Sequence, residues 1–200
     1  GEGPTAPGST PGVPSEQPIP DPTPAEAKLI AKARGGDKAA FGHLYRLHYP
    51  TIVGCLYRRT GDAHTAEDLA ADTFLAAFDA LPRYQITSVP FRMWLLRIAT
   101  NAANRWARDR QRLKLTRIAT VPIVNGQATD RRAAMEEAQA ALLALEPEHQ
   151  AVLSLHYLES LSLDDVGAVI GCPVGTIKSR LARARAAMRE ELERRSQRHG

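Results

Sequence analysis

The sequence predicts an all-α protein with two small helical domains joined by a flexible linker, the C-terminal one a helix-turn-helix. Three observations support this fold class. Apolar residues recur at steps of three and four through most of the chain after residue 24, which is typical of amphipathic helices. No segment shows strand-like alternation of useful length. The helical pattern dissolves between residues 113 and 132, and a patternless stretch of that length indicates an interdomain linker.

Residues 1–24 are rich in proline and glycine and hold almost nothing that could form a core. We expect them to form a disordered, extended tail, and they predict no function. Residues 25–112 then form the first helical domain, residues 113–132 the linker, and residues 133–200 the second domain. The second domain is expected to open with helices over residues 133–145 and 147–158.

Capping and stop signals predict where the helices of the first domain begin and end. A short helix begins near residue 25 and ends at the two glycines of positions 35 and 36. A second helix, capped by Asp37, runs to the glycine at position 61. The third has Thr65-x-x-Asp68 as its capping box. The fourth opens at Pro90, with Ser88 as its candidate cap.

The stretch from residue 161 to 188 contains two helix starts separated by one tight break. Ser162 caps the first helix in a Ser-x-x-Asp pattern that Asp165 completes, and Gly171 ends it. Pro173 occupies the first position of the second helix. The buried face of this second helix is expected to consist of Val174, Ile177, Leu181, Ala184 and Met188. Its opposite face is basic and polar, which suits a DNA major groove, although a helical hairpin with a solvated basic face has the same pattern.

Basic residues are concentrated in two separated helices of a chain with net charge +4 and an isoelectric point near 9.3. They lie within residues 101–118 and 176–189, so a polyanion contacted at two places is indicated. Cys55 and Cys172 are far apart and have no metal-ligand spacing to other residues, which argues against a disulfide framework. No apolar run approaches a membrane span and no export signal is present, so a cytoplasmic protein is expected.

One face of the fourth predicted helix suits single-stranded nucleic acid. Its side-chain amides can bond base edges and its arginines can contact phosphates. The members of this face are Asn101, Asn104, Arg105, Arg108 and Arg112, and the loop of residues 82–89 adds Tyr84. Trp94 and Trp106, on the apolar stripe of the same helix, are interpreted as core anchors.

His64, Asp68 and Asp72 share one helix face at i, i+4 and i+8, the most enzyme-like feature of the sequence. That spacing suits a hard metal ion, but no carboxylate from elsewhere and no general base accompany it. An acidic docking face, or an acidic first turn near the helix dipole, is the favoured interpretation. We therefore expect no catalytic residue, no metal and no cofactor.

Four segments together resemble a bacterial sigma factor of the extracytoplasmic-function (ECF) group. DKAAFGHLYRLHYP, at residues 37–50, looks like the opening of sigma region two. RTGDAHTAEDLAADTFLAAFDAL, at 59–81, is similar to its polymerase-binding part. PFRMWLLRIATNAANRWARDR, at 90–110, resembles its promoter-melting and minus-ten-reading helix. Residues 142–188 resemble region four almost throughout. The combined motif order is far more specific than a helix-turn-helix alone.

This resemblance implies an initiation subunit without chemistry of its own. Region two would dock on the clamp helices of the largest subunit of core RNA polymerase, through a face made of Asp68, Leu69, Asp72 and Phe74. The sequence departs from the family pattern there, because Ala71 and Asp72 replace the usual Gln and Glu.

The resemblance also implies two contacts with promoter DNA. Region four would place its second helix on the minus-35 element through Pro173, Thr176, Lys178, Ser179, Arg180, Arg183 and Arg185. Region two would hold a flipped minus-ten base. The minus-ten contacts would be Tyr84, Ser88, Asn101, Asn104, Arg105 and Arg108.

Family members are commonly held inactive by an anti-sigma protein, so such a partner is expected. A free-standing helix-turn-helix regulator is the alternative function, although it would not need the second basic helix. Gly167 stands where the family usually has Ala, and on propensity alone it should weaken that helix slightly.

Overall fold

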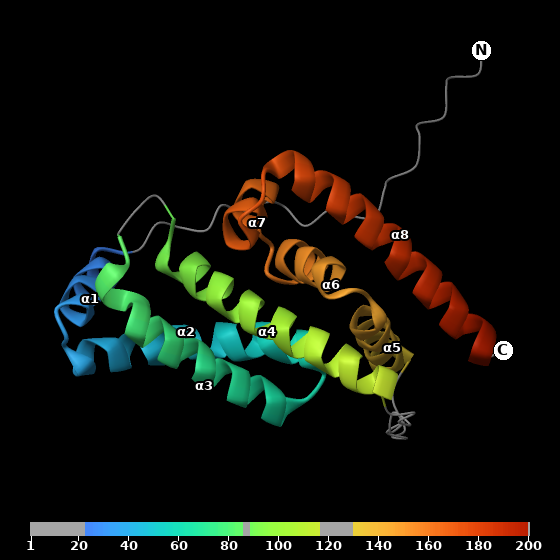
Figure 1. The fold of residues 1–200 in the computed structure, drawn as a ribbon, viewed down its shortest axis with the longest axis horizontal. Coiled ribbons are helices and arrows are strands. Elements are labelled where there is room, and N and C mark those ends of the chain that lie inside the picture. The colour runs from blue at the N-terminus through green and yellow to red at the C-terminus, as the bar shows by residue number, and fades with distance from the viewer. Residues whose placement is uncertain (1–22, 86–88, 117–129, 200) are drawn as a thin grey trace, which may run out of the picture.

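The computed structural model describes residues 23–85, 89–116 and 130–199, and all of its regular elements within those ranges are helical. The predicted all-α fold class is confirmed. Three helices of the first half, α2, α3 and α4, pack on one another (Figure 1). Helices α6 and α7 pack against α4, α5 packs against α2, and α8 packs on the outside of α5, α6 and α7. Residues 1–22 of the expected tail and 117–129 of the expected linker lie outside the described residues, whereas α1 begins at Pro24, α4 reaches Thr116 and α5 begins at Asp130.

The first half contains α1 (Pro24–Arg34), α2 (Lys38–Thr60), α3 (Ala63–Ala80), the 3₁₀ turn η1 (Leu81–Arg83) and α4 (Phe91–Thr116). The predicted cap of α2 is confirmed, since the Asp37 carboxylate accepts hydrogen bonds from the amides of Ala39 and Ala40. Gly61 ends α2 with φ 71°, a left-handed conformation that glycine adopts without strain.

The capping box predicted for α3 is wrong. Asp62, three residues before Thr65, has the extended backbone of an N-cap, and its carboxylate accepts hydrogen bonds from the Thr65 amide at 2.8 Å and the Thr65 hydroxyl at 2.7 Å. These bonds stabilise the ionised carboxylate and lower the pKa of Asp62. Thr65 therefore lies inside the first turn, and Asp68 is a solvent-exposed residue of the second turn.

The second half contains α5 (Asp130–Ala144), α6 (Pro147–Leu153), the π-helical turn η2 (Ser154–Leu158), α7 (Leu163–Ile170) and α8 (Val174–His199). Ser162 caps α7 as predicted, accepting a hydrogen bond from the Asp165 amide at 3.1 Å. Pro173 precedes α8 rather than occupying its first position, and its carbonyl accepts bonds from the amides of Thr176 and Ile177. Helix α8 continues eleven residues beyond Met188, the last member of the predicted apolar stripe, to His199.

Gly167 allows the close approach of α7 to the turn that follows it. A Cβ at this position would lie 2.8 Å from the backbone oxygen of Cys172, a separation that real Cβ atoms essentially never show. The Gly167 carbonyl also accepts hydrogen bonds from the amides of Gly171 and Cys172. The expected small loss of helix propensity is therefore accompanied by a packing reason for glycine, which the sequence pattern did not reveal.

Helix α4 lies at the centre of the molecule, between α2 and α3 on one side and α6 and α7 on the other (Figure 1). The buried apolar residues form one continuous cluster that includes members from both halves. At the end of α2, a Cβ on Gly61 would lie 2.7 Å from Leu143 of α5, and Gln139 donates a hydrogen bond to the Tyr57 carbonyl. The two halves therefore share an extensive interface in this arrangement.

Candidate nucleic-acid interface

The apolar face of α8 fixes its orientation in the second half. Ile177 and Ala184 are fully buried and Leu181 nearly so, against the core formed with α6 and α7. The other two members of the predicted stripe, Val174 and Met188, are half-buried. Because residues at steps of three and four share a face, anchoring this stripe turns the basic side of α8 outward.

The exposed side of α8 carries two rows of polar side chains. Lys178 and Arg185, seven residues apart, lie on one flank. Thr176, Ser179 and Arg183, at steps of three and four, lie on the other, and all five are exposed. The exposed alanines at positions 182 and 186 lie between the two rows. A helix with small residues on its crest and cations on both flanks can enter a major groove and contact the phosphates on either side.

Two predicted contacts of α8 already have partners within the protein. Arg180 is half-buried and forms an ion pair with Glu148 of α6, with the nitrogen and oxygen 3.2 Å apart. The Ser179 hydroxyl donates a hydrogen bond to the Thr176 carbonyl at 2.9 Å. Arg183, which is exposed and one turn further along, is thus better placed than Arg180 to reach a base edge.

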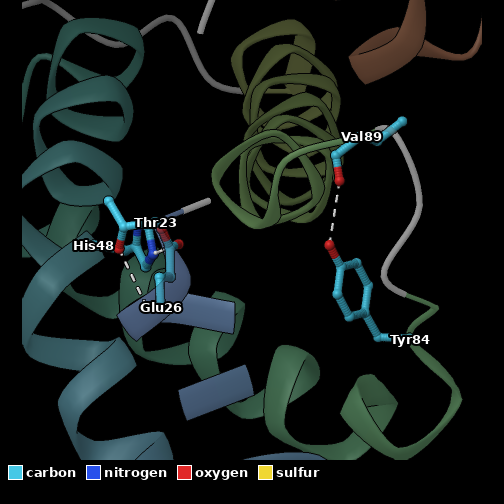
Figure 2. Close-up of polar contacts among 5 residues, drawn as sticks. All are labelled: Thr23, Glu26, His48, Tyr84 and Val89. Carbon is cyan, nitrogen blue, oxygen red and sulfur yellow. Dashed lines mark hydrogen bonds and ion pairs between the residues drawn. The ribbon is translucent and has the colours of Figure 1, made fainter. Parts of the chain in front are cut away.

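Tyr84 is a structural residue of the loop that precedes α4. Its hydroxyl donates a hydrogen bond to the Val89 carbonyl at 3.2 Å (Figure 2). Its ring packs against Trp94 and Phe91, at centroid distances of 4.7 and 5.5 Å. The side chain is 8% exposed, and burial raises the pKa of its phenol. Tyr84 therefore has a structural role in this loop. Ser88, the other predicted contact in the loop, lies outside the described residues.

The same region is anchored to α1 by a buried polar contact. The side chains of His48 of α2 and Glu26 of α1 are hydrogen-bonded, with Nε2 and Oε1 2.9 Å apart, and Thr23 caps α1 beside them (Figure 2). The His48 ring lies 5.4 Å from the ring of Phe91 at the start of α4. Burial lowers the pKa of His48, although Glu26 raises it in part.

A cavity of about 310 Å³ lies where this loop meets α4. Its volume is at the lower end of the range for small-ligand pockets, on the order of 300–1,000 Å³. Most of its wall comes from the first half, but one residue, Ala168, belongs to α7. The lining residues are Arg83, Tyr84, Gln85, Val89, Met93, Trp94, Arg97 and Ala168. A planar ring entering it would meet the Trp94 side chain, so the interpretation of Trp94 as a core anchor describes only part of its surroundings.

A row of exposed polar side chains leads from this cavity along α4. Arg97, Asn101, Arg105 and Arg108 follow one another at steps of three and four and are all exposed. A continuous row of one amide and three guanidinium groups beside an aromatic pocket suits a single strand of nucleic acid. Arg97 was not among the predicted contacts, and its position four residues before Asn101 is the signal that points to it.

Asn104, predicted for the same surface, is turned inward. Its side-chain oxygen accepts a hydrogen bond from Arg59 Nη2 at 2.6 Å. Arg59 is 2% exposed and also approaches the carbonyl oxygens of Thr100 at 3.4 Å and Pro147 at 3.5 Å. Burial lowers the pKa of Arg59 to about 10, so it remains charged at neutral pH. Asn104 thus helps to satisfy a buried cation between the two halves of the protein.

The face of α3 predicted to contact a partner is mixed in character. Asp68 and Asp72 are exposed and Leu69 is half-buried, but Phe74 is 4% exposed and packs against Tyr45 at a centroid distance of 4.6 Å. Phe74 lines an apolar groove of about 500 Å³ between α2 and α3, together with Lys38, Phe41, Gly42, Tyr45, Ala71, Leu75 and Phe78.

Leu75 is the residue of this face that the sequence interpretation missed. Its side chain is 63% exposed, and it follows Asp68 and Asp72 at a helical spacing, so it belongs to the same face. His64 and Asp68 form an exposed ion pair at 3.1 Å. Within the described ranges, no group of three or more histidine, cysteine, aspartate or glutamate side chains is placed to hold a metal ion.

These features are those of an all-helical protein with a helix-turn-helix half and a second exposed basic helix face on α4. The sequence profile of Sigma-70 region 2 matches residues 44–113, and that of Sigma-70, region 4, matches residues 135–188. The ECF sigma factor SigW of Bacillus subtilis is 30% identical over 82% of this chain and 95% of its own length. The chain belongs to the ECF group of RNA polymerase sigma factors.

Other relatives agree with this assignment. The ECF sigma factor SigE of Mycolicibacterium smegmatis is 34% identical over 80% of this chain and 66% of its own length. Two solved structures share the fold. CnrH in complex with the cytosolic domain of CnrY has a TM-score of 0.63 at 27% identity, covering 84% of this chain and 97% of that one. RpoE of Bartonella quintana, in complex with the anti-sigma factor NepR, has a TM-score of 0.59 at 26% identity, covering 76% and 96%.

In the described part of the chain, no helix is both long enough and apolar enough to cross a membrane. Cys55 is buried, Cys172 is half-buried, and both thiols are free.

Proposed function

We propose that this sigma factor binds core RNA polymerase, reads a minus-35 element with α8, and opens DNA at a minus-ten element with α4 and the adjoining cavity. The observation that carries the proposal is the pairing of two surfaces in one chain. One is the exposed basic side of α8, and the other is the row from Arg97 to Arg108 that ends at an aromatic cavity. A duplex-reading surface alone would serve a repressor; the second surface suits a single strand.

Duplex recognition is assigned to the two flanks of α8. Arg183 and Lys178 would bond base edges or phosphates, while the exposed alanines at the crest would contact thymine methyl groups. Strand recognition is assigned to the cavity, which would receive a base flipped out of the duplex. Flipping costs a few kcal/mol of lost stacking, and contacts with Trp94, Arg97 and Asn101 would offset it.

Core polymerase binding is assigned to the exposed face of α3 and its groove. Leu75, exposed beside Asp68 and Asp72, would be buried against the clamp helices of the largest subunit. Burying one leucine stabilises a complex by about 1.5–3 kcal/mol. Leu75→Asp should therefore weaken core binding at least about tenfold without affecting the fold, since the side chain is exposed. Met135→Asp, an equally exposed apolar position on α5, is the matched control and should bind normally.

An anti-sigma protein is the proposed regulatory partner, and the cytoplasm the proposed location. The support is that the related RpoE structure contains an anti-sigma factor and the related CnrH structure contains the cytosolic domain of CnrY. The exposed faces of α3 and α4 are the surfaces such a partner would need to cover.

The direct test is reconstitution with core RNA polymerase and fragmented genomic DNA, followed by sequencing of run-off transcripts. We expect transcripts from one promoter class, with two shared upstream elements, and none from core enzyme alone. Specific binding of duplex DNA by the isolated protein, with no association with core polymerase, would instead establish a free-standing regulator.

A further inference from the structure

The cavity before α4 is lined by hydrogen-bond donors that have few acceptors beside them. Arg83 and Arg97 each contribute a guanidinium group, which has five N–H donors and no acceptor. Gln85 contributes one amide, which can donate or accept. Among the described residues that line the cavity, none carries a carboxylate. A ligand that enters the cavity must therefore supply hydrogen-bond acceptors.

The aromatic residues of the cavity cannot read the edge of a base. The Tyr84 hydroxyl donates its hydrogen bond to the Val89 carbonyl at 3.2 Å, so this donor is already used within the protein (Figure 2). Trp94 is half-buried, and its ring lines the cavity as a surface on which a planar group can stack. Recognition of hydrogen-bonding atoms is thus left to the two arginines and Gln85.

The two arginines belong to different elements and have different surroundings. Arg97 begins the exposed row of α4 that continues through Asn101 and Arg105, a row suited to successive phosphates. Arg83 lies outside this row, at the end of the 3₁₀ turn η1, on the loop side of the cavity. It is exposed and has no ion-pair partner within the described residues, so its guanidinium is available to a ligand.

A guanidinium group distinguishes the four bases by the arrangement of their acceptors. It donates two parallel N–H bonds and so prefers two acceptors side by side. Guanine presents O6 and N7 in this way, and cytosine presents O2 and N3 once its pairing is broken. Adenine has an amino group beside both N1 and N7, and thymine has an N–H between its two carbonyl groups. Guanine and cytosine therefore fit an arginine, and adenine and thymine do not.

We propose that Arg83 is a specificity-determining residue of the minus-ten site, which selects a flipped guanine or cytosine over adenine and thymine. The inference rests on the proposed function, because it names the ligand of the same cavity. Trp94 stacks on the flipped base, and the Arg83 guanidinium donates to its two neighbouring acceptors. The Gln85 amide oxygen is available to accept from the amino group that guanine and cytosine both carry. Arg97 contacts the phosphate of the strand.

The test is a selection of single strands by the protein bound to core RNA polymerase. Synthetic DNA strands with a randomised stretch between fixed ends are bound, recovered and sequenced, and strands retained by core enzyme alone serve as the background. We expect one position at which guanine or cytosine is enriched about tenfold or more over adenine and thymine, as is typical of a good bidentate contact.

Two variants of Arg83 test whether this residue causes the preference. Arg83→Lys keeps the charge but not the two-pronged geometry, so the preference should fall to less than about twofold while strands are still bound. Arg83→Gln should move the preference at the same position to adenine, because a glutamine amide can donate to N7 and accept from the N6 amino group. Since Arg83 is exposed, neither variant should change Tm.

Arg105→Gln is the matched control, since it removes an equally exposed guanidinium from the phosphate-contacting row of α4. It should weaken the binding of all strands by a similar factor and leave the preference for guanine or cytosine intact.

The outcomes separate this inference from the proposed function. If strands are retained above the core-enzyme background but no position prefers guanine or cytosine, the assignment of Arg83 is wrong and the proposed function stands. A preference that survives both Arg83 variants overturns the assignment in the same way. If no strand is retained above that background, the proposed strand recognition itself fails, and the inference fails with it.

Discussion

Replacing Gly167 by alanine distinguishes helix propensity from packing in the helix-turn-helix. Propensity favours the substitution, since alanine stabilises a helix interior by about 1 kcal/mol relative to glycine. Packing opposes it, because the new Cβ would lie 2.8 Å from the Cys172 backbone oxygen. That oxygen belongs to a turn and cannot rotate away as a flexible side chain would.

The packing term should be the larger of the two. Relieving the contact requires the turn at residues 171–173 to shift away from α7. A shift of this kind costs about 1–3 kcal/mol in well-packed interiors. It also weakens the hydrogen bonds that the Gly167 carbonyl accepts from Gly171 and Cys172, at 2.8 and 3.0 Å, each contributing about 1 kcal/mol. We expect a net loss of about 1–2 kcal/mol.

Gly175→Ala is the control in the same motif. Nothing lies within 4 Å of a Cβ at this position, which is exposed in the first turn of α8. Its stability should therefore rise by about 0.4–1 kcal/mol through the unfolded state. In thermal unfolding followed by circular dichroism, a change of 1 kcal/mol shifts Tm by about 2–4 °C in a chain of this size. The two variants should thus move Tm in opposite directions, with Gly167→Ala lower by about 2–8 °C.

An increase in Tm for Gly167→Ala similar to that of Gly175→Ala would refute this reasoning. It would show that the turn accommodates a methyl group, and that the only effect of glycine at position 167 on stability is its low helix propensity.

Three further predictions concern recognition and pH. Arg183→Ala should weaken binding to the mapped minus-35 duplex about tenfold in a gel-shift assay, because one base or phosphate contact is lost. Core binding and Tm should stay unchanged, and an equal loss of duplex binding and core binding would indicate misfolding. Asn101→Ala should lower the yield of open complexes in permanganate footprinting and spare binding to the minus-35 duplex, and an unchanged yield would contradict its assignment. Burial lowers the pKa of His48 below 6.5, so the unfolded chain takes up this proton first. The free energy of unfolding should therefore decrease as pH falls from 6.5 through the folded-state pKa, and His48→Gln should remove that part of the pH dependence in urea titrations.

Local signals made the helices predictable. Asp37, Ser162 and Gly171 act on backbone groups within four residues, so their effects can be deduced without knowledge of tertiary structure. The cap of α3 was misassigned because Asp62 and Thr65 are both suitable caps three residues apart. The sequence does not show which of them takes the extended backbone.

Tertiary contacts limited the prediction of the site. An aromatic side chain such as that of Tyr84 is suited to stack on a base, but its ring packs against Phe91 and Trp94 within the protein. Asn104 shares the helical spacing of Asn101, yet it is drawn inward by Arg59, a residue 45 positions earlier. Periodicity describes which residues share a face, and it carries no information about which charged residue of another helix meets that face.

The interface between the halves combines apolar contacts with buried charges. An interface of apolar contacts alone would stabilise the contact between the two halves without favouring one relative position of their helices. Arg59 is bound by Asn104 and by backbone oxygens of both halves. Glu159 is bound by Arg58 and Arg92. Each of these two buried charges must keep its partners or become exposed to water. Partial separation therefore leaves buried charges unpaired and is costly, whereas full separation hydrates them. Separation of the halves would break the ion pairs of Glu159 with Arg58 and Arg92, whereas Arg59 would keep its bond to Asn104, which lies in the same half of the chain.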